Sequence, residues 1–253
     1  MTDPTDFIPD YLLIGHISHD VTPRGPQLGG TVSYASYTAA AFGLKVAILT
    51  SAALDEPLLR DLPPDVAVVS LPAKHTTTFE NRYTPDGRIQ YMYHRASLLG
   101  PDSLPEAWRQ ARLIHLAPIA YEIDPAMLTA FGNNPICVTP QGWMRHREPD
   151  GRVSTVPWKD DVRVLPHARL TVLSEEDIRH APELEKIFAG LAPILVVTRA
   201  ERGCTVYQKG KSRDYPAVPV EQVDPTGAGD VFATALHIAL DRTGDLDRAV
   251  QIA

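Results

Sequence analysis

The string Asp-Pro-Thr-Gly-Ala-Gly-Asp at residues 224–230 constrains this chain more than any other feature. Gly227, Ala228 and Gly229 open an apolar helical segment, and the first N–H groups of a helix have no intrahelical partner. These donors and the positive end of the helix dipole form a site for an anion. Because the side chains are small, the anion can approach the backbone closely. The string therefore predicts an anion site at a helix N-terminus.

Asp230 ends this string, and its carboxylate would repel an anion held by the amides. The arrangement makes chemical sense if Asp230 takes a proton from a hydroxyl while the amides hold the charge developing on a phosphoryl group. We interpret the string as the apparatus of phosphoryl transfer to an alcohol. The alternative is a glycine-rich turn before a buried helix, with Asp230 stabilising the first turn.

The composition limits the classes of ligand. With 24 basic and 31 acidic residues the formal net charge is −7, which argues against a broad nucleic-acid-binding face. A polyanion such as ATP must therefore be met locally, by amides, a metal ion and a few cations. The start of the chain has no signal-peptide pattern, and no apolar run is long enough to span a membrane, so we expect a cytoplasmic protein. Cys137 and Cys204 lie in apolar segments and are expected to be reduced core thiols.

The order of apolar runs predicts an α/β fold. An apolar run at 11–17, an irregular stretch, an alanine-rich helix at 31–42 and a second run at 46–50 form a β-loop-α-β beginning. Further short runs suit buried parallel strands, at 113–116, 136–139, 170–173 and 194–198. Helices are expected at 125–131, capped by Asp124, at 182–189 and at 246–253, capped by Asp245; 205–215 reads as a hairpin. We expect one domain, residues 1–253: an open, mostly parallel sheet flanked by helices.

A polar and aromatic segment interrupts this alternation. Residues 75–83 and 88–95 surround Thr84-Pro85-Asp86-Gly87, a strong turn signal, and are expected to form a small β-flap. With the loop or irregular strand at 18–30, segment 74–96 is expected to form a lid. A lid excludes water from a phosphoryl-transfer site. The alternative is a surface hairpin with no such role.

Several motifs together resemble the PfkB/ribokinase-like family of carbohydrate kinases, nearest its inositol and polyol branch. They are Asp20, the pair Gly29-Gly30, the flap, residues 195–203 and residues 224–230, in family order along most of the chain. The resemblance implies that Asp20, Gly29 and Gly30 contact the substrate. It also implies nucleotide contacts from Thr198, Arg199, Gly203, Asp224 and Thr226, although Arg199 is equally well read as a solvated surface arginine.

Other substrate contacts are expected from polar residues near strand ends and in the flap. Gln141 or Arg145, after the run at 136–139, is expected to border the acceptor. Asn81, Gln90 and Arg95 of the flap are candidates to contact it from above.

The chain also departs from the family pattern. Ala200 replaces the first glycine of T-x-G-x-x-G, and Ser174 and Asp177 stand where the family has N-x-x-E. The resemblance makes Asp177 a candidate magnesium ligand, while the same string also fits a helix N-cap that needs no metal. Only 23 residues follow Asp230, whereas family members continue for several elements. We expect that the C-terminal elements are missing or that the nucleotide site is completed differently.

The function expected from these features is an ATP-dependent, Mg²⁺-assisted transfer of a phosphoryl group to a hydroxyl of a sugar, a polyol or a nucleoside. The alternative is a non-catalytic sugar- or polyol-binding protein of the same fold. A kinase of vitamin precursors on this scaffold would lack the flap. A homodimer through the lid is a further expectation, because an open hairpin leaves a pairing edge.

Overall fold

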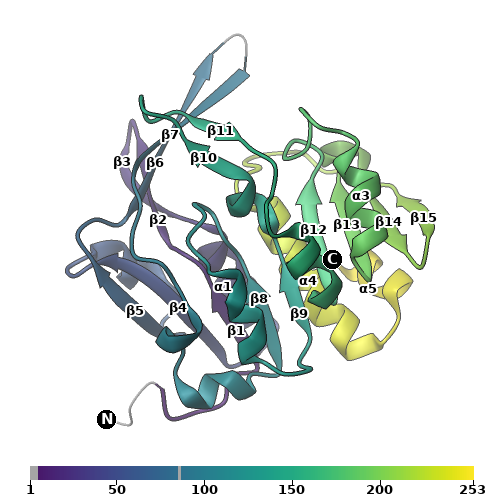
Figure 1. Ribbon diagram of the computed structural model, residues 1–253, viewed down its shortest axis with the longest axis horizontal. Helices are drawn as coiled ribbons and strands as arrows, with labels where there is room; N and C mark the ends of the chain where they lie inside the picture. The colour runs from purple at the N-terminus through teal and green to yellow at the C-terminus, as the bar shows by residue number, and fades with distance from the viewer. Residues whose placement is uncertain (1–4, 85–86) are drawn as a thin grey trace.

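A nine-stranded sheet forms the centre of the computed structural model, which describes residues 5–84 and 87–253 (Figure 1). Its strand order is β15-β14-β13-β12-β9-β8-β1-β4-β5. Neighbours from β5 to β13 are parallel, and β14 and β15 continue the sheet antiparallel. The strands are β1 (Tyr11–Ile14), β4 (Val46–Ala53), β5 (Ala67–Ala73), β8 (Leu113–Leu116), β9 (Ile136–Val138), β12 (Leu170–Ser174), β13 (Ile194–Thr198), β14 (Cys204–Gln208) and β15 (Lys211–Tyr215).

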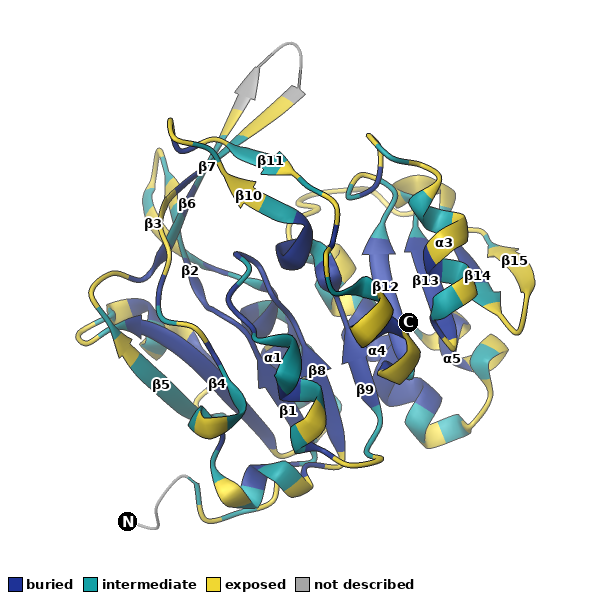
Figure 2. Cartoon of the chain, viewed as in Figure 1, coloured by how far each residue is buried: buried dark blue, intermediate teal, exposed yellow. Residues whose placement is uncertain are grey.

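The two faces of this sheet are covered by different helices. Strand β1 shows why both faces of the sheet must be apolar. Its alternate side chains point to opposite faces, so Tyr11 and Leu13 join one core and Leu12 and Ile14 join another. Helices α1 (Thr31–Ala41), α4 (Ala228–Thr243) and α5 (Leu246–Ile252) cover the Tyr11 face; α2 (Asp161–Val164), α3 (Leu184–Leu191) and several 3-10 turns cover the other. Figure 2 shows the resulting buried central strands. The expected α/β fold is confirmed.

A second sheet stands beside the carboxyl ends of the central strands. Its order is β3-β2-β6-β7, and a two-stranded ribbon, β10 (Arg145–Arg147) with β11 (Val153–Thr155), lies next to it (Figure 1). The four strands come from the segments expected to form a lid: β2 (Ser18–Thr22), β3 (Gly25–Gly29), β6 (Thr77–Thr84) and β7 (Gly87–His94). The stretch 18–30 is thus a regular hairpin. Pro85 and Asp86 of the expected turn lie outside the described residues.

One predicted helix has a different geometry, and one strand was not predicted. The segment after Asp124 is a 3-10 helix, Pro125–Ala130, although the Asp124 carboxylate does accept a hydrogen bond from the Ala126 N–H as a cap should. Strand β5 was not predicted, because Ser70 and Pro72 interrupt its apolar residues and it is only partly buried at the sheet edge. No helix among the described residues is long and apolar enough to cross a membrane.

Buried polar side chains connect the Tyr11 face of the sheet to α4. The Tyr11 hydroxyl lies 3.2 Å from His115 Nδ1 and 3.3 Å from His237 Nδ1, and His115 Nε2 lies 3.2 Å from the Thr139 hydroxyl. Burial lowers the pKa of His115 to about 3 and that of His237 well below its ordinary value. Both imidazoles are therefore neutral in the folded protein at neutral pH.

These histidines should make the protein lose stability as the pH falls below about 6.5. A lowered folded-state pKa means that the unfolded chain binds the extra protons, which costs about 1.4 kcal/mol per pH unit for each histidine. Urea unfolding at pH 7.5, 6.5, 5.5 and 5.0 should show this loss, and His115→Asn should make it shallower. The exposed His146→Asn is the control. Parallel pH curves for wild type and His115→Asn would contradict the assignment.

Candidate active site

Asp230 lies in the first turn of α4, at the carboxyl ends of the sheet strands. Its partly buried carboxylate accepts a hydrogen bond from the Thr31 hydroxyl at the start of α1. Burial raises the pKa of Asp230 to about 6; the Thr31 hydrogen bond and the Arg145 charge oppose this rise, and Asp177 adds to it. A carboxylate with a pKa near 6 is a stronger base than ordinary aspartate and is still ionised at pH 7.

The backbone before Asp230 offers some, but not all, of the amides expected to bind an anion. The Ala228 N–H donates to the Pro225 carbonyl at 3.1 Å, whereas the sequence predicted that this amide would face the anion. Within residues 5–84 and 87–253, no acceptor pairs with the N–H groups of Gly227, Gly229 or Asp230. Three donors therefore remain around the turn.

Gly227 shapes this turn and contacts a residue that the sequence did not single out. It has φ +77°, and a Cβ placed on it would lie 2.4 Å from Cδ1 of Tyr34. Burial raises the pKa of Tyr34, and the charges of Asp20, Asp230 and Asp224 raise it further. The ring of Tyr34 thus lies between the helix turn and the expected acceptor side. Only its position one turn into the helix after Gly30 could have indicated this.

Asp20 and the glycine pair lie together on the acceptor side. The Ser18 hydroxyl donates to Asp20 Oδ1 at 2.7 Å, and a Cβ on Gly29 would lie 2.3 Å from Asp20 Oδ2. Burial raises the pKa of Asp20, partly offset by the Ser18 hydrogen bond. Gly30, at φ +90°, precedes α1, and a Cβ there would lie 2.5 Å from the His16 carbonyl. The two glycines therefore make room for Asp20 and for the tight entry to α1.

A line of hydrogen bonds joins Arg145 to Asp230. Arg145 Nη2 donates to Gln141 Oε1 at 2.9 Å, and Gln141 Nε2 donates to the Thr31 hydroxyl at 3.1 Å, which in turn contacts Asp230. Gln141 is thus linked to Asp230 through Thr31, and its expected contact with the acceptor stays a prediction. The Arg145 guanidinium also acts electrostatically on Asp177.

Two flap residues, Asn81 and Gln90, contact each other, and Gln90 also lines a cavity. Gln90 Nε2 donates to Asn81 Oδ1 at 3.1 Å across strands β6 and β7. A cavity of about 370 Å³ lies between the second sheet and the carboxyl ends of the strands. Gln90, Gln141, Arg145 and Asp177 are among its lining residues. Asn81 does not line it but holds Gln90.

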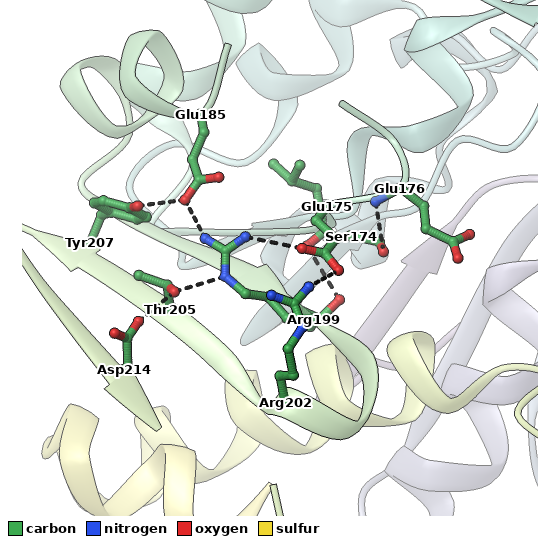
Figure 3. Close-up of polar contacts among 11 residues, drawn as sticks. Ser174, Glu175, Glu176, Glu185, Arg199, Arg202, Thr205, Tyr207 and Asp214 are labelled. Atoms are coloured by element: carbon green, nitrogen blue, oxygen red, sulfur yellow. Dashed lines mark hydrogen bonds and ion pairs between the residues drawn. The ribbon is translucent and has the colours of Figure 1, made fainter. Parts of the chain in front are cut away.

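Arg199 on the expected nucleotide side is occupied by protein partners (Figure 3). Its Nε donates to the Thr205 hydroxyl at 2.9 Å, and its two terminal nitrogens meet Glu175 and Glu185. Glu175 also pairs with Arg202. The charge of Arg199 is therefore compensated, and its guanidinium joins α3 to the ends of β12 and β13. This pairing competes with the phosphate contact that the sequence suggested.

The loop after β13 keeps a glycine-like path despite its altered sequence. Ala200 has φ +51°, the left-handed conformation that glycine adopts most easily. Gly203 has φ +93°, and a Cβ there would lie 2.0 Å from the Tyr215 carbonyl oxygen. The Thr198 hydroxyl is 3.4 Å from the Leu173 carbonyl oxygen. The backbone thus follows the course that a glycine at position 200 would allow.

Asp224 and Thr226 build the approach to the helix turn. The Asp224 carboxylate accepts the Thr226 N–H at 2.8 Å, and hydrogen bonds from Thr226 lower the pKa of Asp224. Both residues are exposed. An aspartate that accepts the N–H two residues on fixes a turn locally, so Asp224 orients Gly227 even without a ligand.

Asp177 lies where a magnesium ligand was expected, but it also serves the backbone. Its Oδ2 accepts the Ser174 N–H at 2.9 Å, and burial raises its pKa, opposed by Ser174 and Arg145. No group of three or more His, Cys, Asp or Glu side chains in the described part of the chain could hold a metal ion. Mg²⁺ in phosphoryl-transfer sites needs only one or two carboxylates besides phosphates and water, so a single Asp177 fits that pattern.

Glu122 is a buried carboxylate that the sequence did not reveal. Its two oxygens accept the N–H groups of His16, Ile119 and Ala120 at 2.7 to 3.0 Å. It therefore joins the loop after β1 to the loop after β8. The Ile119 carbonyl accepts a hydrogen bond from Arg145 at 3.1 Å, which links this support to the site. No motif or spacing distinguishes Glu122 from an exposed loop acid.

Comparison with known proteins gives one family match and relatives of related activity. Residues 163–253 match the model of the pfkB family carbohydrate kinases. A cytidine kinase of Thermococcus kodakarensis is 27% identical over 96% of this chain and 92% of its own length. A fructokinase of Klebsiella pneumoniae is 27% identical over 61% of this chain, which spans only 54% of that enzyme. A pyrophosphate-dependent kinase in the ribokinase family, solved with a pyrophosphate analog and myo-inositol, superposes with a TM-score of 0.80 at 21% identity, covering 96% of this chain and 91% of that one.

Proposed function

We propose that Asp230 catalyses phosphoryl transfer from ATP to a hydroxyl of a sugar, a polyol or a nucleoside. The match of residues 163–253 to the pfkB family model and the superposition on a ribokinase-family kinase support this proposal. One observation supports the mechanism above all. A carboxylate whose pKa is raised to about 6 lies beside three unpaired N–H groups at a helix N-terminus. This is a base next to an anion site.

In the proposed mechanism the acceptor lies between Asp20 and Asp230. The Asp20 carboxylate accepts hydrogen bonds from acceptor hydroxyls, and Gly29 lets the ring approach. Asp230 removes the proton from the attacking hydroxyl. The N–H groups of Gly229 and Asp230 hold the transferring phosphoryl group. The second sheet closes over the acceptor and excludes water.

The donor is proposed to lie along the turn at 224–227 and the loop from Thr198 to Gly203. Mg²⁺ would be held by the donor phosphates with Asp177 and would neutralise phosphate charge. We place no nucleotide contact on the Arg199 guanidinium, because Glu175 and Glu185 already bind it. Pairing of two lids through an open strand edge is the proposed route to a homodimer, to be tested by light scattering.

A panel of acceptors crossed with two donors tests the proposal. Purified protein is incubated with sugars, inositols and nucleosides and with ATP or pyrophosphate, and phosphorylated product is detected by mass spectrometry. Turnover of one acceptor with ATP supports the proposal. Turnover with pyrophosphate but not with ATP would mean that pyrophosphate is the phosphoryl donor. Acceptor binding by calorimetry with no product from either donor would favour the binding-protein alternative.

A further inference from the structure

The cavity lined by Gln141 and Arg145 holds more positive charge than the proposed reaction uses. Arg88 of β7, Arg145 at the start of β10 and Arg179 after β12 all line it. These residues come from three separate parts of the chain, so the cavity brings together cations that are far apart in sequence. An arrangement of this kind is suited to an anion.

The arginines differ in how far the protein already compensates their charge. Arg145 is bound to Gln141 and the Ile119 carbonyl and acts electrostatically on Asp177 and Asp230. By contrast, Arg88 and Arg179 form no ion pair with any acid in the described ranges 5–84 and 87–253. Two guanidinium groups are therefore available to a ligand.

The two acids of the cavity do not cancel these charges. Asp177 accepts the Ser174 N–H, and although the charges of Arg145 and Arg88 both act on it, it forms no ion pair with either arginine among the described residues. Glu176 is exposed and forms no ion pair within the described residues. An arginine presents planar, paired donors that match the oxygens of a phosphate, so two of them lining one cavity suit a phosphate better than a neutral hydroxyl.

We propose that Arg88 and Arg179 bind a phosphate group other than the one being transferred. This inference rests on the proposed function, since it adds a second phosphate subsite to the same site. The phosphate has two sources: a phosphate already present on the acceptor, or the leaving half of a pyrophosphate donor. In either case one arginine comes from strand β7 of the second sheet and the other from the segment after β12, so the phosphate would contact both parts of the molecule.

Binding of inorganic phosphate and of pyrophosphate, measured by calorimetry without turnover, tests the subsite. Arg88→Gln and Arg179→Gln should each weaken binding about tenfold or more, since each removes a charge-assisted hydrogen bond. Arg82→Gln is the matched control on the same sheet, because Arg82 is paired with Glu80. Thermal melts establish that each variant is folded. Unchanged affinity in the Arg88→Gln/Arg179→Gln double variant would overturn the proposal.

Kinetics with the same variants then identifies the source of the phosphate. A raised KM for a phosphorylated acceptor, with the KM for its unphosphorylated counterpart unchanged, assigns the subsite to the acceptor. A raised KM for pyrophosphate, with that for ATP unchanged, assigns it to the donor. Arginine-dependent anion binding without any kinase turnover would leave the subsite standing and refute the proposed function. Kinase turnover and anion affinity that are both unchanged in the two arginine variants would support the proposed function and refute the subsite.

Discussion

Asp230→Asn should lower kcat by about 10²- to 10⁴-fold, the usual contribution of a general base. The substitution keeps the size of the side chain and one oxygen for the Thr31 hydroxyl, but the amide cannot accept the acceptor's proton. Initial rates under saturating donor and acceptor measure the loss. Acceptor and donor binding by calorimetry should remain, because the substitution removes neither Asp20 nor the N–H groups of the turn.

The pH dependence of Asp230 supplies the control. Since burial raises its pKa to about 6, wild-type kcat/KM should fall about tenfold per pH unit below pH 6. Asp224→Asn, in the same string but exposed, should keep this acidic limb. Wild-type turnover by Asp230→Asn would exclude the carboxylate as the base.

The raised pKa of Asp230 favours its role as a base but lowers the stability of the folded protein at pH 7. The folded protein binds the Asp230 proton more tightly than the unfolded chain does, so the ionised carboxylate destabilises the fold at pH 7. Asp230→Asn should therefore raise the free energy of unfolding, on the order of 1 kcal/mol. Lost turnover with retained or increased stability separates a catalytic role from the turn-stabilising alternative.

Glu122→Ala should destabilise the protein by about 3 kcal/mol or more. It leaves the buried N–H groups of His16, Ile119 and Ala120 without their acceptor, and each such group costs about 1 to 3 kcal/mol. Urea unfolding at pH 7.5 measures the loss. Turnover at a temperature where the variant is folded should also fall, because the Ile119 carbonyl helps to hold Arg145.

Two further variants make the Glu122 result interpretable. Glu122→Gln keeps one acceptor oxygen and should cost less than Glu122→Ala. Glu106→Ala removes an acid whose side chain is 89% exposed and should change stability by less than about 0.5 kcal/mol. A Glu122→Ala protein as stable as wild type would mean that other groups or water satisfy these amides.

The sequence predicted the fold well where local signals were strong. Apolar runs such as 113–116 match their strand residue for residue, because a buried parallel strand needs apolar side chains on both faces. Glycine positions were equally informative: Gly227 and Gly30 mark backbone that other residues adopt only with strain. Strand β5 gave a weaker signal, because Ser70 and Pro72 interrupt its apolar residues and an edge strand is only partly buried.

The site was predicted less completely, because partners distant in sequence decide what a polar residue does. The sequence suggested Arg199 as a phosphate ligand, but its guanidinium pairs with Glu175 and Glu185. Glu122 and Tyr34 have no motif, and only the fold gives them a place in the site. The roles of Asp20, Asn81 and Asp177 remain predictions that binding experiments must test.

The way the site is assembled also bears on when it can form during synthesis. Asp20 belongs to the second strand of the chain, whereas Asp230 and its turn begin α4, near the end of the described residues. Chains fold as they leave the ribosome, N-terminal parts first. A nascent chain could thus complete β1, the acceptor side and the second sheet while the base and the phosphoryl-binding amides are still unmade. Under the proposed mechanism, such a chain would hold the acceptor-binding residues but could not transfer a phosphoryl group until α4 packs against the finished sheet.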